Sequence, residues 1–237
     1  CDLLYNWRNT IVNTRAYGKD PELVIKNAKA YVRGVRESGL AVCCKHFPGD
    51  GIEELDQHLV MGVNTMECDE WDSTFGHVYK EMIDSGIQSI MAGHIALPEY
   101  SRKLRPGIKD EDIMPATLAP ELITDLLRGK LGFNGLVLTD ASHMAGMTAA
   151  MPRSQQVPGA IAAGCDMFLF FNDIEEDFGY MMDGYRNGII TEERLTDALR
   201  RILGLKASLK LHEKMKKGTL IPEKEGLSVV GCAEHLA

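Results

Sequence analysis

A lysine and a histidine stand next to backbone-breaking residues in the segment 45–51. Lys45 and His46 follow a short apolar run over 40–44, which is typical of a buried strand. Pro48 and the two glycines that follow it end the strand and force a loop. A cation and an imidazole at the end of a buried strand indicate a functional site rather than part of the core. Cys43 and Cys44 are expected to pack within the strand as small buried residues.

Asp56 and His58 lie two positions apart, shortly after this loop. In an extended segment, that spacing puts both side chains on one side. A carboxylate that holds one imidazole nitrogen fixes the tautomer and raises the basicity of the other nitrogen, as proton transfer requires. The alternative interpretation is an exposed polar loop without chemistry.

Asp140 closes the apolar run 135–139, and the small residues of 141–146 after it would leave room for a ligand. A carboxylate there can attack an electrophilic carbon or stabilise a cation. Its other common role is to cap the following helix, and the spacing alone does not separate the two.

Imidazole and carboxylate side chains could also form a zinc or manganese site at the same strand ends. No pair of histidines has HxH or HExxH spacing, so a metal site is the weaker hypothesis and no cofactor is expected. The candidate ligands for that hypothesis are His46, His94, His143, Asp50 and Asp140.

Arg15 lies in the polar segment before the first expected helix, next to Tyr17. Its planar guanidinium could hold a hydroxyl or a carboxylate. A surface arginine with an aromatic neighbour explains the same residues.

Helical and strand patterns alternate along the chain. The first helix has a strong start signal, because Asp20 precedes a proline at the first helical position. Alternating helices and nearly continuous apolar strands predict βα units around a parallel sheet that is buried on both faces. Helices are expected near 21–39, 71–85, 118–131, up to 164, 174–187 and 192–207, and strands over 40–45, 88–93, 135–139 and 167–171.

Polar residues end every expected strand, which favours a TIM-type barrel over a doubly wound sheet, since a parallel barrel collects its catalytic groups at that rim. Four βα units make about half of an eight-stranded barrel. We therefore expect residues 1–209 to form an incomplete barrel whose first strands come from a removed upstream segment, a symmetry mate or a second chain. Residues 210–237 are expected to be a C-terminal tail or linker.

Composition narrows the partners. The chain has 237 residues, 45% of them hydrophobic, and a formal net charge of −8 without a basic stripe, which argues against nucleic-acid and anionic-membrane partners. Six cysteines without CxxC spacing predict neither a disulfide framework nor a zinc site. Without a leader or an apolar run of membrane-spanning length, a cytoplasmic location is expected.

These residues together resemble the N-terminal catalytic barrel of glycoside hydrolase family 3, in its β-N-acetylglucosaminidase branch. The resemblance extends over about residues 2–209. It rests on several ordered segments: NTRAYGKDP at 13–21, KHFPG at 45–49, Asp-x-His at 56–58, Gly-His at 93–94, PAT at 115–117, LGF at 131–133 and LTD at 138–140.

The resemblance implies an α/β (β/α)8 barrel, incomplete here, and a retaining hydrolase that releases terminal β-linked N-acetylglucosamine from peptidoglycan fragments or chitooligosaccharides. It implies that Asp140 is the nucleophile that carries a covalent glycosyl group, and that His58, oriented by Asp56, is the acid/base. The residues that it implies as contacts for the carbohydrate substrate are Arg15, Lys45, His46 and His94.

A histidine as proton donor leaves less negative charge in the path of an anion, so phosphate is a possible acceptor in place of water. Two residues depart from the branch: Asp50 stands where histidine is common, and Gln57 replaces a small hydroxyl residue. The alternatives are a β-glucosidase or β-xylosidase of the same family, a metal-dependent barrel hydrolase, and an inactive fragment.

Overall fold

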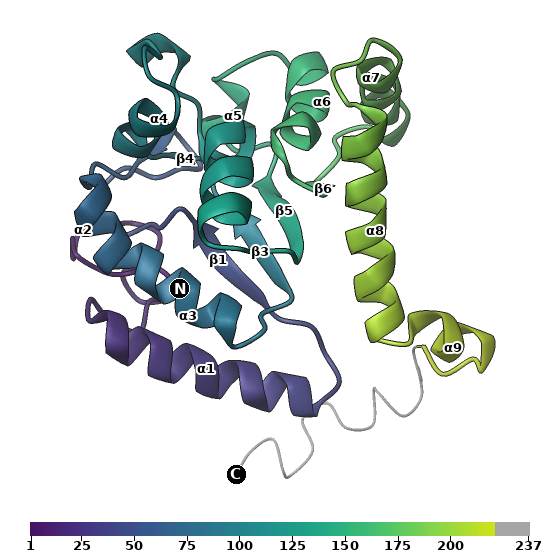
Figure 1. Cartoon of the computed structure of the whole chain (residues 1–237), viewed down its shortest axis with the longest axis horizontal. Coiled ribbons are helices and arrows are strands. Elements are labelled where there is room, and N and C mark those ends of the chain that lie inside the picture. The colour runs from purple at the N-terminus through teal and green to yellow at the C-terminus, as the bar shows by residue number, and fades with distance from the viewer. Residues whose placement is uncertain (221–237) are drawn as a thin grey trace. The chain divides into compact units, whose positions relative to one another are not determined.

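A four-stranded parallel sheet forms the centre of residues 1–202 (Figure 1). The computed structural model describes residues 1–220, and the chain divides into two compact units, 1–202 and 203–237. The expected parallel α/β fold is confirmed, since all four strands run in one direction in the order β1-β3-β5-β6. The strands are β1 (Cys43–Phe47), β3 (Ser89–Ala92), β5 (Leu136–Ala141) and β6 (Met167–Leu169).

All four strands differ by one to three residues from their expected bounds at one or both ends. Pairing of β1 with β3 begins at Cys43 opposite Ser89, three residues later than expected, and β1 extends to Phe47, so Lys45 and His46 lie inside the strand and not at its end. β6 ends at Leu169 instead of 171, and Phe170 and Phe171 are exposed. The apolar run continues past the point where β5 supplies pairing partners, and sequence alone does not mark that point.

Helix α1 (Pro21–Glu37) begins as expected, because the Asp20 carboxylate accepts a hydrogen bond from the Glu22 amide at 3.1 Å. Its apolar stripe is buried and packs beside α3 (Phe75–Asp84), as Figure 1 shows. The helix expected over 71–85 is divided, since Thr74 adopts φ −119° and ψ −93° between α3 and the shorter α2 (Cys68–Ser73).

The helix expected over 118–131 has wider turns. The short 3₁₀ turn η2 (Ala116–Leu118) precedes η3 (Glu121–Lys130), a π-helix in which the Leu131 amide donates to the Leu126 carbonyl, five residues back. The remaining elements are β2 (Gly62–Val63), β4 (Ile95–Ala96), α4 (Pro98–Leu104), η1 (Asp110–Asp112), α5 (Ala145–Thr148), α6 (Arg153–Ala163), α7 (Ile174–Arg186), α8 (Glu192–Ser208) and α9 (Leu211–Lys216).

The core lies between the sheet and the helices α1, α2, α3, α4 and η3. Phe47, Trp71, Tyr79 and Tyr100 are fully buried and meet edge to face, with ring centroids 5.2 to 6.2 Å apart. The Trp71 indole donates to the Pro48 carbonyl at 2.8 Å, so the core also holds the loop that follows β1.

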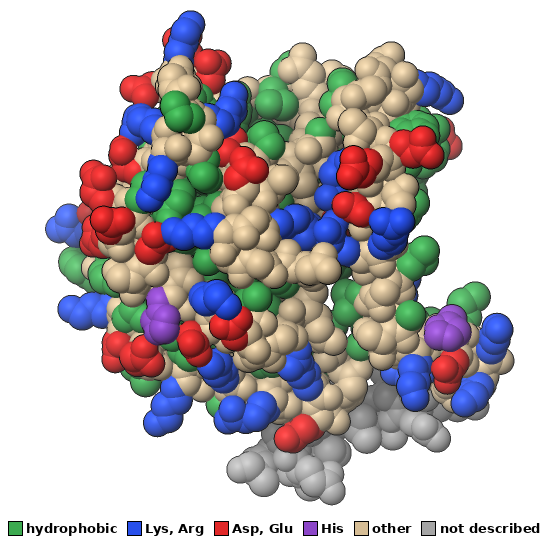
Figure 2. All heavy atoms as spheres, viewed as in Figure 1, with side chains coloured by type: hydrophobic (Ala, Val, Ile, Leu, Met, Phe, Trp, Pro, Cys, Tyr) green, Lys and Arg blue, Asp and Glu red, His purple; other side chains and the backbone are tan. Residues whose placement is uncertain are grey.

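Acidic and basic side chains are interspersed over the face shown in Figure 2. Among residues 1–220, no helix combines the length and the apolar character that a membrane crossing requires. The expected boundary near residue 209 stays a prediction. Within the expected tail, 210–237, the structure places α9, and residues 221–237, which include Cys232, lie outside the described part.

Candidate active site

Asp140 and His46 face each other across the carboxyl ends of two strands. Asp140 lies near the end of β5, and its Oδ2 is 3.9 Å from Nε2 of His46 on β1. The Asp140 side chain is 15% exposed, and its Oδ1 accepts a hydrogen bond from the Ala141 amide at 2.7 Å. The carboxylate is therefore held in place and still open to a ligand.

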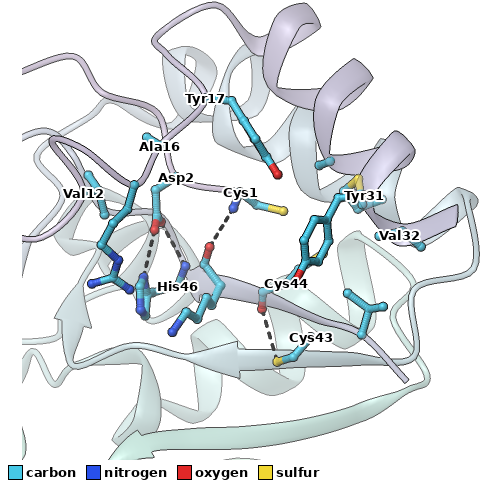
Figure 3. A pocket seen from close by; sticks show the side chains of 15 residues that line it. Cys1, Asp2, Val12, Ala16, Tyr17, Tyr31, Val32, Cys43, Cys44 and His46 are labelled. Atoms are coloured by element: carbon cyan, nitrogen blue, oxygen red, sulfur yellow. Dashed lines mark hydrogen bonds and ion pairs between the residues drawn. The ribbon is translucent and has the colours of Figure 1, made fainter. Parts of the chain in front are cut away.

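Asp2 fixes the His46 ring from the other side (Figure 3). Its Oδ2 accepts from His46 Nδ1 at 2.8 Å, and its Oδ1 accepts the backbone amides of His46 and Asp50 at 2.9 and 3.0 Å. Burial opposes the charged form of Asp2, but attraction to His46 and these hydrogen bonds outweigh it and lower the pKa of the carboxyl. The sequence analysis missed Asp2, because a single acid that precedes a loop carries no pattern.

Lys45 and Arg15 line a pocket of about 320 Å³ beside this pair. Figure 3 shows that the pocket lies between β1 and α1. The Cys1 amine donates to the Lys45 carbonyl at 2.8 Å. Arg15 is exposed, and its guanidinium donates to the Ile11 carbonyl at 3.4 Å. The structure thus brings Arg15, Lys45 and His46 to one cavity.

Asp56 and His58 form a hydrogen-bonded pair, as their spacing predicts. His58 Nδ1 lies 2.6 Å from Asp56 Oδ1. The segment is a turn and not an extended strand, because Asp56 also accepts the amide of His58 through its side chain and those of Leu59 and Val60 through its carbonyl. Burial raises the pKa of Asp56, but the hydrogen bonds from the backbone and ring of His58 lower it by more. The net effect is a lowered pKa, which favours the ionised carboxylate.

The turn that carries this pair is bonded to the segment after Asp140. The amides of Ala145 and Gly146 donate to the carbonyls of His58 and Gln57, at 3.0 and 3.1 Å. His58 itself is 54% exposed, so the imidazole of the pair is open to a ligand from solvent.

His94 is buried at the end of β3, and the protein itself occupies both of its ring nitrogens. Nδ1 lies 2.9 Å from the Thr117 hydroxyl, and Nε2 donates to the Ala141 carbonyl at 2.9 Å. Burial lowers the pKa of His94, against the opposing effects of the Ala141 carbonyl and the charge of Asp140. This geometry anchors the end of β5, and the expected contact between His94 and substrate stays a prediction.

Asp50, a candidate metal ligand from the sequence, is buried among hydrogen-bond donors. Its Oδ1 accepts from the Asn9 side chain and the Gly51 amide, and its Oδ2 accepts from Gln57 Nε2 at 3.0 Å. Burial and the neighbouring charge of Asp2 raise its pKa. In the part of the chain that the structure describes, no three His, Cys, Asp or Glu side chains are grouped to hold a metal ion.

Taken together, the site offers a carboxylate at one strand end and an imidazole that a second carboxylate orients. Such groups can attack an electrophilic carbon and transfer a proton to the leaving atom.

Relatives of known structure share this fold. The β-glucoside phosphorylase BglX superposes with a TM-score of 0.90 at 45% identity, over 93% of this chain and 40% of that chain. A glycoside hydrolase family 3 β-N-acetylglucosaminidase from Paenibacillus sp. superposes with a TM-score of 0.81 at 28% identity, over 89% of this chain and 39% of that chain.

Sequence comparison agrees. A β-N-acetylglucosaminidase/β-glucosidase of Cellulomonas fimi is 52% identical over 236 residues, which are 100% of this chain and 41% of that protein. A β-hexosaminidase of Chromobacterium violaceum is 32% identical over 169 residues, which are 71% of this chain and 44% of that protein. The chain thus spans less than half of the length of these relatives. Since residues 1–205 match the glycosyl hydrolase family 3 N-terminal domain, the chain belongs to glycoside hydrolase family 3.

Proposed function

We propose that this chain carries the catalytic groups of a retaining β-N-acetylglucosaminidase. In this proposal Asp140 is the nucleophile, His58 is the acid/base, and Asp56 orients His58. The observation that carries it is the 2.6 Å pair of Asp56 and His58, on a turn that is bonded to the segment following Asp140. The substrates are peptidoglycan fragments or chitooligosaccharides that end in a β-linked N-acetylglucosamine.

The reaction has two displacements. Asp140 attacks the anomeric carbon and forms a glycosyl ester, while His58 Nε2 gives its proton to the departing oxygen. His58 then takes a proton from the incoming acceptor, which breaks the ester and restores the original configuration. Retaining glycosidases usually employ two carboxylates, and here an imidazole with a carboxylate behind it fills the second role.

The pocket that Arg15, Lys45 and His46 line suits a sugar with free hydroxyls. Lys45 and Arg15 offer donors for hydroxyl oxygens, and His46 faces both the pocket and the nucleophile. Glucosides are the second candidate, because BglX is described as a β-glucoside phosphorylase and the Cellulomonas fimi relative as both activities. Turnover of aryl β-N-acetylglucosaminide against aryl β-glucoside decides between them, and a larger kcat/KM for the glucoside would reject the first.

Phosphate is the proposed acceptor beside water. His58 is neutral after it has given up its proton, so it repels an incoming anion less than a carboxylate would. If this is correct, added phosphate yields sugar 1-phosphate. Product that stays free sugar at saturating phosphate would restrict the proposal to hydrolysis.

We propose further that the sheet is half of an eight-stranded barrel. Among the described strands, β1 and β6 each have a partner on one side only, and an open parallel sheet exposes its edges. Strands from an upstream segment or from a second chain would complete the barrel and the carbohydrate site. Addition of such a segment should raise the melting temperature of the chain, and an unchanged melting temperature would contradict this.

A further inference from the structure

Gln57 is buried between the half-buried Asp56 and the exposed His58. Only 1% of its surface is exposed, although its neighbour His58 is 54% exposed in its side chain. Its Nε2 donates to Asp50 Oδ2 at 3.0 Å, and its Oε1 accepts the His94 amide at 3.2 Å. One side chain therefore joins the turn of the acid/base pair to the loop after β1 and to the end of β3.

The chemistry of the neighbours fixes which way this amide points. Asp50 already accepts from the Asn9 side chain at 2.8 Å and from the Gly51 amide at 2.6 Å, so it offers only acceptor atoms. The His94 backbone can only donate. A reversed Gln57 amide would place oxygen against carboxylate and N–H against N–H, and both contacts would be unfavourable.

A second set of bonds holds the opposite side of the turn. The Gly146 and Ala145 amides donate to the carbonyls of Gln57 and His58, and both donors lie five to six residues after Asp140. Gly146 also sits where a side chain would not fit, since an added Cβ would lie 2.8 Å from the Gln57 carbonyl oxygen. The turn is thus fixed to three neighbouring strand ends without any substrate present.

We propose that the hydrogen bond between Asp50 and Gln57 is a latch that holds the Asp56–His58 pair in its working position in the free protein. Both are positioning residues that act through His58 and do not touch substrate. This inference rests on the proposed function for its catalytic consequence, and on the hydrogen bonds alone for its structural one.

Charge exchange between the two residues tests the latch. Asp50→Asn puts an amide N–H against Gln57 Nε2 or, if rotated, against the donors from Asn9 and Gly51. Gln57→Glu puts a second carboxylate 3.0 Å from Asp50. The double variant D50N/Q57E restores a donor opposite an acceptor, keeps the His94 bond, and leaves the buried charge unchanged.

Amide hydrogen exchange of residues 58–60 and of Ala145, Gly146 and His94 is the first measurement. We expect these amides to exchange at least about tenfold faster in each single variant than in the parent protein, because a buried hydrogen-bond partner is lost. In the double variant the exchange rates should return toward those of the parent. Ser101→Ala is the matched control, since it removes a buried hydrogen bond to Glu121 of 2.8 Å elsewhere. Unchanged exchange in both single variants, or a double variant as fast as the singles, would overturn the latch.

Leaving-group dependence is the second measurement, in the protein that carries the complete site. The single variants should lose more kcat with a poor leaving group, which needs the proton of His58, than with an activated aryl group, and the double variant should recover. An equal loss with both leaving groups would overturn the positioning role. If the single variants exchange faster but the parent protein turns over no substrate, the proposed function is rejected and the latch is retained.

Discussion

Nε2 of His46 lies 3.9 Å from Oδ2 of Asp140, and the other nitrogen of the same ring is held by Asp2 at 2.8 Å. A buried carboxylate thereby fixes the rotation of a ring on β1 that faces the proposed nucleophile on β5, two strands away in the sheet. The arrangement joins three segments that are far apart in the sequence, and it makes Asp2 both a stabilising group and a positioning group for the site.

Asp2→Asn should reduce stability in a pH-dependent way. The pKa of Asp2 is lower in the folded protein than in the unfolded chain, where it is about 3.9. The ionised form of Asp2 therefore stabilises the fold fully at pH values above about 3.9. That contribution is lost as the pH falls from there toward the folded pKa. Urea unfolding should therefore show a large difference between parent and variant at pH 7 that shrinks below about pH 4. A difference that stays constant from pH 7 to pH 3 would contradict the role given to Asp2.

His58→Ala should lower kcat for a substrate with a poor leaving group by about 10²- to 10⁴-fold, the usual contribution of a general acid. With aryl substrates whose leaving groups are acidic, the rate of the first step should fall much less, because such a leaving group departs without a proton. Asp56→Ala should have a smaller effect of the same kind, since the imidazole remains but its tautomer is no longer held. Equal losses for all leaving groups in His58→Ala would assign the acid to another residue.

Arg153→Met should destabilise the fold by about 1–3 kcal/mol, the usual effect of leaving a buried hydrogen-bonding group, here the carboxylate of Asp177, without its partner. Arg153 donates to Asp177 at 2.8 Å, to the Ser142 hydroxyl at 2.7 Å and to the Phe170 carbonyl at 3.0 Å. It thereby ties the segment after Asp140 to the end of β6. Thermal and urea unfolding measure the change.

Arg8→Met is the control for that experiment. Arg8 and Glu54 form an exposed ion pair at 3.3 Å, and such pairs contribute about 0–1 kcal/mol. If the two arginine variants were equally stable, the proposed tie between Ser142 and β6 would be wrong.

Gly49→Ala should lower the free energy of unfolding by more than about 2 kcal/mol. Gly49 has φ +123°, and an added Cβ would lie 2.2 Å from the ring of Phe75. Gly34 in α1 is the matched control, because it is exposed and an added Cβ would meet nothing within 4 Å. Gly34→Ala should stabilise the chain by about 0.5–1 kcal/mol, and similar unfolding curves for the two variants would contradict the tight approach at Gly49.

Local signals predicted the order of helices and strands. The Asp20–Pro21 start of α1 and the apolar runs of β3 and β5 depend on neighbouring residues, which a sequence displays directly. The break at Thr74 and the wide turns of η3 depend on packing against other elements, and no local residue pattern predicts them.

The site shows the same division. Asp56 and His58 could be paired from their spacing because a single residue separates them, although the turn that joins them was not expected. The bond between Asp2 and His46 spans 44 residues, and the burial of Gln57 depends on Asp50 and on the end of β3. Such contacts exist only once the sheet has formed, so no pattern along the chain contains them.

Covalent trapping tests the central assignment most directly. The chain, alone and in the full-length protein, is incubated with a fluorinated β-N-acetylglucosaminyl substrate that slows breakdown of the glycosyl ester, and is then digested and mapped by mass spectrometry. We predict one added sugar on the peptide that contains Asp140, and none in Asp140→Asn. A sugar on any other carboxylate, or an unlabelled full-length protein that still turns over substrate, would contradict Asp140 as the nucleophile.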